Sequence, residues 1–292
     1  MAAPDTITLS VVWGGILAAA EEMGITLRRT AYSEAVREGQ DFSTALFNTQ
    51  GLMIAQGNFS PGHLGSMPFA VKHMLKEYPP ETLHPDDAIL LNDLYMGSGH
   101  LPDIFTFYPV FYQGKLAAFA VNVAHHIDVG GATAGSQAVE GITEFYQEGI
   151  RLIPTRYQQE GVPNSEVMKF IASNVRVPDK VLGDLKAQTN ANRVGARRLV
   201  ELFDRYGFDT VTACMDELLK RSEAAMREEI RKIPDGTGSF EDYMDDYGRD
   251  TEPIKVKCTV TVQGDSMTID YTGSGPQVPA GLNSPYNYTC AY

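Results

Sequence analysis

Residues 100–131, with the sequence HLPDIFTFYPVFYQGKLAAFAVNVAHHIDVGG, contain the pattern that decides the fold of the first part of this chain. Residues 105–111 and 115–123 are two runs of apolar and aromatic side chains, and Gln113-Gly114 lies between them. Apolar runs joined by a short glycine-containing turn are typical of a β-hairpin. The sequence therefore predicts two antiparallel strands that pair across this turn.

Potential metal ligands stand at the open ends of this hairpin. His100 and Asp103 lie in a loop that leads into the first strand, and His125 lies at the far end of the second. Because a hairpin brings those two ends together, the three side chains can share one coordination sphere of two imidazoles and a carboxylate. Taken alone, the segment around His100 also fits a surface histidine and an Asx turn, so the metal prediction depends on the pairing with His125.

Three further residues, His126, Asp128 and His63, each have two interpretations. Consecutive strand residues point to opposite faces, so only one of His125 and His126 readily joins the site while the other packs or orients it. Asp128 either hydrogen-bonds a ligating imidazole or caps the glycine turn that follows it. His63, in a glycine-containing loop, either lines the cleft or is a structural histidine.

Asp41 is a fourth candidate ligand. It lies just ahead of a second predicted hairpin, in which residues 44–47 and 52–55 flank a turn that ends in Gly51. Its polar surroundings suit a ligand, but sequence spacing alone does not bring it to the other candidates.

The remaining patterns predict a mixed α/β fold. Apolar side chains recur at helical spacing after Asp5, the predicted N-cap of the first helix. The acidic, Gly-rich residues 235–250 are predicted to form a loop or an edge element. Helices are predicted over residues 6–30, 165–173, 179–205 and 209–233, a buried strand over 87–93, and a hairpin from 254–262 and 267–271.

A composition shift near residue 235 divides the chain. We predict an N-terminal metal-binding α/β domain with β-hairpins and a helical segment over residues 1–234, and the start of a β-rich domain over residues 235–292. The chain stops at Asn287-Tyr-Thr-Cys-Ala-Tyr292 without a charged or Gly-rich terminus, so the second domain is expected to be incomplete, in a truncated or split form.

Composition and charge exclude several classes of function. A net charge of −13 argues against general binding of nucleic acid or anionic membranes, which requires clustered Lys and Arg. The three cysteines fit neither a disulfide framework nor a zinc ribbon, and the N-terminus lacks a signal sequence, so a cytoplasmic location is expected. P-loop, GxSxG and HExxH motifs are absent from the sequence, so this chain is expected to bind neither nucleotide nor flavin.

Taken together, the motifs resemble the hydantoinase B subunit family. This family also includes C-terminal regions of 5-oxoprolinases, caprolactamase small subunits, and corresponding subunits of acetone and acetophenone carboxylases. The resemblance covers nearly the whole chain, in order. The residues that carry it are AEEMG at 20–24, RTAYS at 29–33, Arg37-Glu38, DFS at 41–43, HLG at 63–65, Asn92-Asp93, HLPD at 100–103, AHHIDVGG at 124–131, QEG at 147–149, NVRVP at 174–178, GDL at 183–185 and Ala187-Gln188.

The resemblance implies a metal centre and a partner. Residues matching His100, Asp103 and His125 hold a metal in the family, together with an aspartate matching Asp41. The donor set favours Zn²⁺, with Mn²⁺ and Fe²⁺ as alternatives. Family members work with a larger actin-like ATPase subunit of the hydantoinase A type, so the resemblance implies a hetero-oligomer in which that partner binds ATP. Members usually run well beyond 292 residues, which again suggests that part of the second domain lies elsewhere.

The function that follows is ATP-dependent opening of a cyclic amide, such as a hydantoin, 5-oxoproline or a lactam, with the metal as the activating group. A ketone carboxylase of the acetone or acetophenone type is the alternative within the family. Outside it, two histidines and a carboxylate could form an Fe(II) site for O₂ chemistry, or the metal could be structural in a scaffold subunit.

Overall fold

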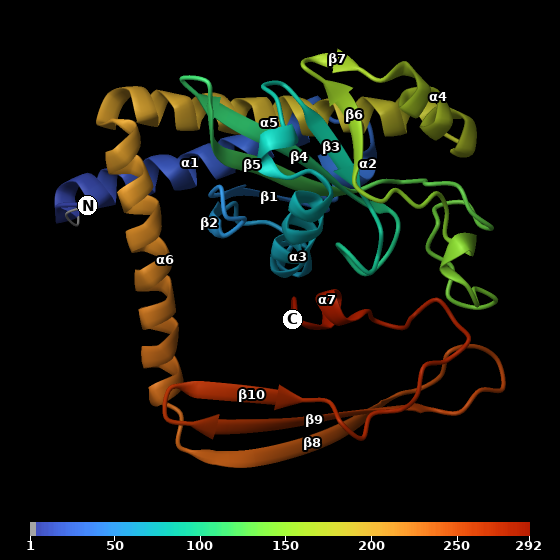
Figure 1. The fold of residues 1–292 in the computed structure, drawn as a ribbon. Coiled ribbons are helices and arrows are strands. Elements are labelled where there is room, and N and C mark those ends of the chain that lie inside the picture. The colour runs from blue at the N-terminus through green and yellow to red at the C-terminus, as the bar shows by residue number, and fades with distance from the viewer. Residues whose placement is uncertain (1–3) are drawn as a thin grey trace. The chain divides into compact units, whose positions relative to one another are not determined.

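The computed structural model describes residues 4–292, which divide into two compact units. Unit 1 contains residues 4–137, 145–215 and 284–292, and unit 2 contains residues 138–144 and 216–283. The mixed α/β class predicted from the sequence is confirmed, with a sheet and helices in unit 1 and a smaller sheet in unit 2 (Figure 1).

Unit 1 is built on a seven-stranded sheet in the order β2-β1-β5-β4-β3-β6-β7, in which every neighbouring pair among the described residues is antiparallel. The predicted hairpins are confirmed as β1 with β2 and as β4 with β5. The strands are β1 (Phe42–Phe47), β2 (Met53–Gln56), β3 (Ala88–Leu91), β4 (Asp103–Tyr112), β5 (Lys115–His125), β6 (Thr155–Gln159) and β7 (Val162–Pro163).

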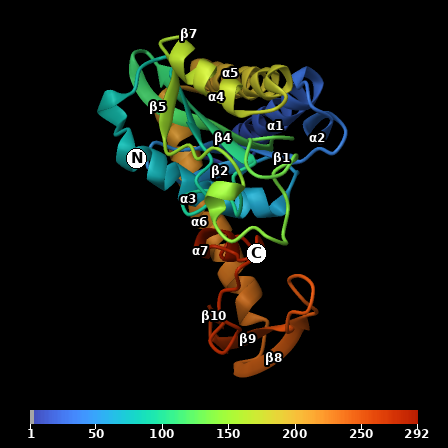
Figure 2. The same ribbon diagram turned by 90° about the vertical axis from the view of Figure 1, so that its right-hand side faces the viewer.

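Helices cover both faces of this sheet (Figures 1 and 2). The long helices α1 (Thr6–Thr30) and α5 (Pro178–Tyr206) pack against each other and on one face, and α3 (Pro61–Glu77) packs on the other. Because both faces are covered, β4 and β5 read as nearly continuous apolar runs. Shorter elements of unit 1 are α2 (Glu34–Arg37), α4 (Ser165–Asn174), α7 (Tyr286–Thr289) and the 3₁₀ helices η1 (Pro80–Thr82) and η2 (Phe145–Gln147).

The first helix begins where the sequence predicts. The Asp5 side chain accepts hydrogen bonds from the backbone N–H groups of Ile7 and Thr8, which confirms it as the N-cap. Among residues 4–292, α1 is the one helix that is long and apolar enough to cross a membrane. Core helices pass the same test, and one stripe of α1, including Val12, Ile16 and Met23, is fully buried within unit 1.

Unit 2 contains a three-stranded antiparallel sheet in the order β10-β9-β8. Its strands are β8 (Gly236–Met244), β9 (Ile254–Gln263) and β10 (Ser266–Asp270). The predicted hairpin of β9 and β10 is confirmed. The residues predicted as a loop or edge element contain β8, an edge strand whose Ser239 and Thr237 hydroxyls lie 3.0 Å and 3.1 Å from those of Thr259 and Thr261.

The contacts divide the chain at a different place from the composition shift near residue 235. The division falls within α6 (Phe208–Arg231). The second half of this helix belongs to unit 2 because Arg231 Nη2 lies 2.7 Å from Asp265 Oδ2, in the turn between β9 and β10. Residues 284–292 belong to unit 1, because the buried Asn287 amide donates to the carbonyl of Leu94.

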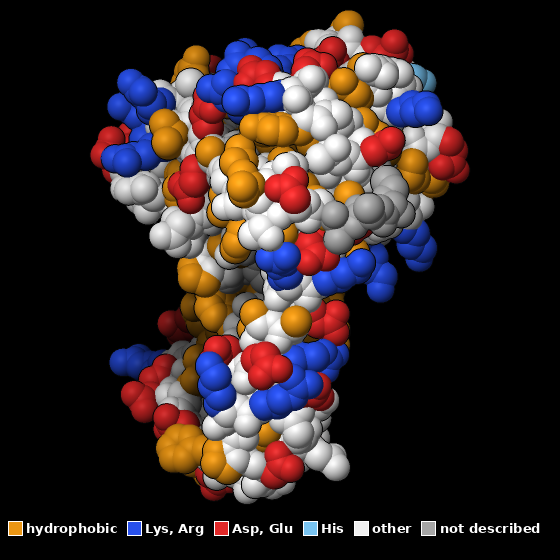
Figure 3. Space-filling view, turned by 90° about the vertical axis from the view of Figure 1, so that its left-hand side faces the viewer, with side chains coloured by type: hydrophobic (Ala, Val, Ile, Leu, Met, Phe, Trp, Pro, Cys, Tyr) orange, Lys and Arg blue, Asp and Glu red, His pale blue; other side chains and the backbone are white. Residues whose placement is uncertain are grey.

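Charged side chains of both signs share the surface drawn in Figure 3, where basic and acidic groups lie interspersed. Along α6, Arg221 and Arg227 pair with Glu217 and Glu223 one turn earlier. Such i,i+4 pairs support a solvated helix face. On the described part of this face, we therefore see no continuous basic surface of the kind that binds a phosphate backbone.

Candidate metal centre

The β4–β5 hairpin brings three of the candidate ligands together. Asp103 and His125 are cross-strand partners, and His125 Nδ1 lies 3.1 Å from Asp103 Oδ1. His100 precedes β4, and its Nε2 lies 2.9 Å from Asp103 Oδ1 and 3.2 Å from His125 Nδ1. The convergence that the hairpin predicted is therefore present in the structure.

Asp41 reaches the same centre through a different strand. It lies one residue before β1, which pairs with β5 so that Phe42 faces Ala124. The backbone N–H of His125 donates to the carbonyl of Asp41 at 2.9 Å, and Asp41 Oδ2 lies 4.0 Å from His125 Nδ1. The Asp41 side chain is 47% exposed, so this carboxylate stands at the solvent edge of the centre.

His63 also joins the centre, although the sequence places it in a loop. It lies in the first turn of α3, because Pro61 occupies the first helical position, where a proline does not disrupt the helix. His63 Nε2 lies 3.1 Å from Asp103 Oδ2 and 3.8 Å from Asp41 Oδ1. His63 is buried between the two carboxylates of the centre and is not among the residues that line the adjacent pocket.

Electrostatics hold the buried carboxylate in its charged form. Burial raises the pKa of Asp103, but the positive charges of His63 and His100 and the hydrogen bonds from His100 and His125 outweigh burial and hold that pKa well below its usual range. Burial likewise lowers the pKa values of His63 and His100, and the Asp103 charge overcomes it and raises both. The Ser98 hydroxyl donates to Asp103 Oδ2.

His126 points away from the centre, as strand alternation predicts. Its Nε2 lies 3.0 Å from Gln188 Oε1 on α5, and the side-chain amide of Gln188 donates to the carbonyl of Ile104 at 2.7 Å. Burial lowers the pKa of His126, so the ring is neutral and its Nε2–H donates to Gln188. His126 thus ties β5 to α5 behind the centre.

Asp128 makes neither of the two contacts predicted for it. Its carboxylate accepts from the Arg176 backbone N–H and from Arg176 Nη1, the latter at 2.8 Å. The same guanidinium donates to the carbonyls of Gly130 and Gly131 at 3.0 Å and 2.7 Å. The glycine turn after β5 is therefore held by an arginine that Asp128 orients, rather than by Asp128 itself.

Two further side chains, Gln137 and Glu148, support the centre. The Gln137 side-chain amide lies 2.9 Å from His125 Nε2, on the side of the ring away from Asp103. Glu148 Oε2 accepts from the Leu101 backbone N–H at 3.1 Å and so fixes the loop that carries His100. Glu148 belongs to a family motif, but its role depends on contacts between distant segments that sequence spacing does not reveal.

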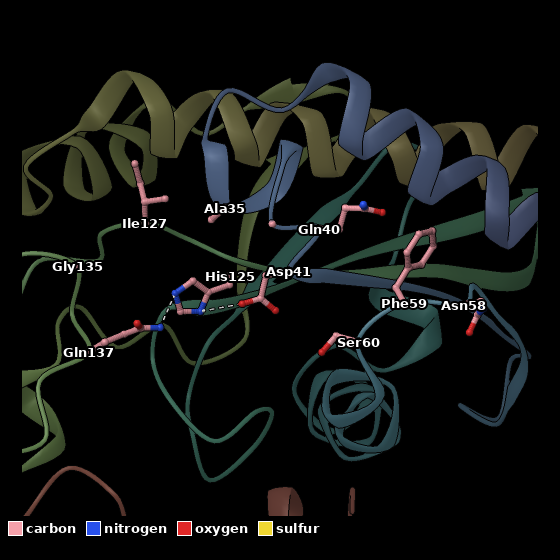
Figure 4. Close-up of a pocket in the computed structure, with 11 residues that line it drawn as sticks. Ala35, Gln40, Asp41, Asn58, Phe59, Ser60, His125, Ile127, Gly135 and Gln137 are labelled. Atoms are coloured by element: carbon pink, nitrogen blue, oxygen red, sulfur yellow. Dashed lines mark hydrogen bonds and ion pairs between the residues drawn. The ribbon is translucent and has the colours of Figure 1, made fainter.

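A pocket of about 840 Å³ opens beside this cluster. Figure 4 shows Asp41, His125 and Gln137 side by side at one end of it, with Asn58, Phe59 and Ser60 at the other. The pocket thus exposes two of the candidate ligands to a molecule the size of a small ring compound.

The donor set fits a divalent transition metal. Ligand atoms bound at roughly 2.0–2.2 Å from one ion lie about 2.8–3.6 Å from each other in octahedral or tetrahedral geometry, and the donor atoms of His100, Asp103 and His125 are separated by 2.9–3.2 Å. Two imidazoles with carboxylates suit Zn²⁺, Mn²⁺ or Fe²⁺. Because metal binds neutral imidazole, an ion would replace the protons that Asp103 now favours on its histidine neighbours.

Comparison with known proteins places the chain in a family. The model of the hydantoinase B/oxoprolinase family matches residues 5–292. The chain is 37% identical to caprolactamase subunit beta of Pseudomonas jessenii over 281 residues, and 33% identical to 5-oxoprolinase 1 of Arabidopsis thaliana over 314 residues. These alignments cover 96% and 98% of the chain.

Solved structures agree with this assignment. The ATP-dependent caprolactamase from Pseudomonas jessenii superposes with a TM-score of 0.90 at 35% identity, over 98% of this chain and 49% of that one. The nucleotide-free acetone carboxylase superposes with the same TM-score over 98% of this chain and 40% of that one, at 18% identity, which shows a shared fold. The chain spans 48% of the length of caprolactamase subunit beta and 24% of 5-oxoprolinase 1. Fold, motifs and family model agree that this chain belongs to the hydantoinase B/oxoprolinase family.

Proposed function

We propose that this chain is the metal-binding part of an ATP-dependent amidohydrolase that opens a cyclic amide, such as a hydantoin, 5-oxoproline or a lactam. The observation that carries the proposal is the convergence of His100, Asp103 and His125 with Asp41 beside a pocket. The 35% identity to an ATP-dependent caprolactamase over almost the whole chain supports the substrate class.

In this proposal, Asp41, His100, Asp103 and His125 hold the ion. A divalent ion bound there would supply Lewis-acid polarisation of a substrate oxygen and charge for the activation of water. Asp103 contributes the buried negative charge, and in the metal-free protein the positive charges of His63 and His100 hold its pKa well below the usual range despite burial. Asp41 would complete the donor set from the solvent edge, and His63 Nε2 can hold a proton between the two carboxylates.

We propose that a larger ATPase subunit of the actin-like type completes the enzyme and binds the ATP. The name of caprolactamase subunit beta implies a second subunit in that protein, and its structure is described as ATP-dependent. The sequence here contains no P-loop, in keeping with ATP on the partner. The three cysteines are free thiols, which fits the reducing cytoplasm proposed as its location.

The test combines metal analysis with turnover. The chain is co-expressed with its ATPase partner, and ATP-dependent ring opening of caprolactam, 5-oxoproline and hydantoin is measured alongside metal content. We expect His100→Ala and His125→Ala each to lose the metal and at least about 100-fold in turnover. His84→Ala is the matched control, because His84 is half exposed and pairs with Asp87 away from the centre.

Two results would contradict the proposal. One is unchanged metal content and activity in both histidine variants. The other is incorporation of labelled bicarbonate into product from acetophenone, with no opening of the cyclic amides, which would identify the carboxylase alternative. The likeness to acetone carboxylase does not separate the two activities, because at 18% identity it shows the fold alone.

A further inference from the structure

The segment 284–292 returns from the far end of the sequence to the loop that carries His100. Asn287, in the short helix α7, is only 4% exposed, and its amide donates to the carbonyls of Leu94 and Gly97. A buried side-chain amide with two backbone acceptors is a strong local anchor. Segment 284–292 is therefore fixed to unit 1 within a few residues of the metal centre.

Glycines in that centre make room for two tyrosines of this segment. A Cβ atom placed on Gly99 would lie 2.7 Å from Cδ1 of Tyr288, and one placed on Gly62 would collide with the Tyr292 hydroxyl. Gly99 directly precedes His100, and Gly62 directly precedes His63. The two phenol rings thus lie against the backbone of the residues that come just before two histidines of the centre.

Of the two phenols, Tyr288 is the one held in place. Its hydroxyl lies 3.4 Å from that of Tyr292, which is 79% exposed. Burial, the hydrogen bond with Tyr292 and the nearby negative charges of Asp103 and Asp41 raise the pKa of Tyr288. An ordinary phenol has a pKa of about 10, so Tyr288 keeps its proton at neutral pH and its hydroxyl can donate a hydrogen bond.

We propose that Tyr288 is a further catalytic residue of this centre, whose hydroxyl donates a hydrogen bond to the oxygen of an amide-like substrate bound at the metal centre. This inference rests on the proposed function. A neutral donor suits a site rich in carboxylates, because it can stabilise negative charge on the substrate oxygen without adding a group that forms an ion pair with Asp103. No bond is formed or broken at the phenol.

The experiment uses Co²⁺ as the metal and acetohydroxamate as an amide-like oxygen ligand. The visible absorption of Co²⁺ reports both metal binding and acetohydroxamate binding to the protein. For Tyr288→Phe, we expect Co²⁺ affinity within about twofold of the wild type and acetohydroxamate affinity reduced about three- to tenfold, as for the loss of one hydrogen bond. In the complex with the ATPase partner, kcat for ring opening should fall about tenfold or more.

Tyr286→Phe is the matched control, because it removes the same hydroxyl from the same helix at a side chain that is 77% exposed. It should leave both affinities unchanged, and thermal melting checks that each variant is folded. If the wild-type chain binds no Co²⁺, the proposed function fails together with this inference. If Co²⁺ binds, two results would overturn the role of Tyr288 while leaving the proposed function intact. One is an acetohydroxamate affinity of Tyr288→Phe within twofold of the wild type, and the other is the absence of acetohydroxamate binding to the wild type.

Discussion

Asp103 shows how one residue organises the centre. Its carboxylate is almost completely buried and lies within 3.1 Å of nitrogen atoms of three histidines. An unpaired buried carboxylate would be strongly unfavourable, so these imidazoles and the Ser98 hydroxyl are what allow the charge to exist there. Without metal, positive charge on the histidines serves that purpose.

The metal-free protein should therefore lose stability as the pH rises. The Asp103 charge raises the pKa values of His63 and His100 above their value in the unfolded chain despite burial. The stabilisation that this provides is complete below the unfolded pKa of about 6.5 and is lost as the pH rises through the folded pKa values. Burial lowers the pKa of His126, which acts in the opposite direction. The contribution of His63 and His100 is therefore measured in EDTA as the fall in Tm from pH 6 to pH 8 in wild type relative to a variant without the Asp103 charge.

Asp103→Asn provides the control for this prediction. The amide keeps the shape of the side chain and removes its charge, so the two histidines lose the interaction that raises their pKa values. The difference in Tm between pH 6 and pH 8 should then shrink. An equal difference in Asp103→Asn and wild type would show that other groups cause it.

The residues of the centre differ in how far the sequence could predict them. His100, Asp103 and His125 were predictable because a single hairpin joins them, and strand alternation also gave the direction of His126. Asp41 reaches the centre through the pairing of β1 with β5, and His63 through the packing of α3 on the sheet. These are long-range contacts that local patterns do not specify.

At the scale of elements, α5 holds the back of the sheet through buried amides. Gln188 joins His126 to the carbonyl of Ile104, and Asn192 bonds both Asn122 and the carbonyl of Thr106. Each of these partners is buried. The docking of α5 on β4 and β5 therefore combines apolar packing with directional contacts, which fix how the helix lies along the strands.

Gln188→Met should destabilise the protein by about 2–6 kcal/mol. The substitution removes two hydrogen bonds and leaves the His126 ring and the Ile104 carbonyl buried without those partners, at a cost of about 1–3 kcal/mol each. Chemical denaturation measures the free energy of unfolding. Asn190→Met, on an exposed position of the same helix, is the control and should change it by less than about 0.5 kcal/mol.

Secondary structure was predicted well where apolar side chains recur with a clear period, and less definitely where the residues are mostly polar or glycine. The helices α1 and α5 have long apolar stripes and recognisable ends, and the hairpins have glycine turns. For β8 the sequence left a loop and an edge element open, because its residues are rich in Gly, Asp and Glu and are exposed, and its pairing with β9 depends on cross-strand hydroxyls and charges.

For the molecule as a whole, the centre lies entirely within unit 1. A ligand that binds only the folded form stabilises it by about 2.7 kcal/mol when its concentration is 100 times Kd. Saturation with Mn²⁺ or Zn²⁺ should therefore raise the Tm of unit 1 by about 5–10 °C. In hydrogen exchange, the added protection should appear around residues 38–43, 98–103 and 125–137, and not in β8, β9 or β10.

The same measurement on Asp103→Asn tests whether the candidate centre causes the effect. Loss of this buried carboxylate should abolish the metal-dependent protection. Protection that persists in the variant, or that is equally large in the sheet of unit 2, would place the bound ion elsewhere.

The adjacent pair His125-His126 has a consequence for how the register of β5 is specified during folding. If β5 slipped by one residue against β4, His126 could stand opposite Asp103, and an imidazole would still reach the metal ligands. The slip would, however, turn Asn122 away from the main-chain carbonyl of Gln188 and from Asn192 Oδ1, and so remove two buried hydrogen bonds. The register of β5 is therefore specified by the face of the sheet that packs against α5, not by the face that carries the metal centre. A refolding assay for this protein should follow the docking of α5 rather than the uptake of metal.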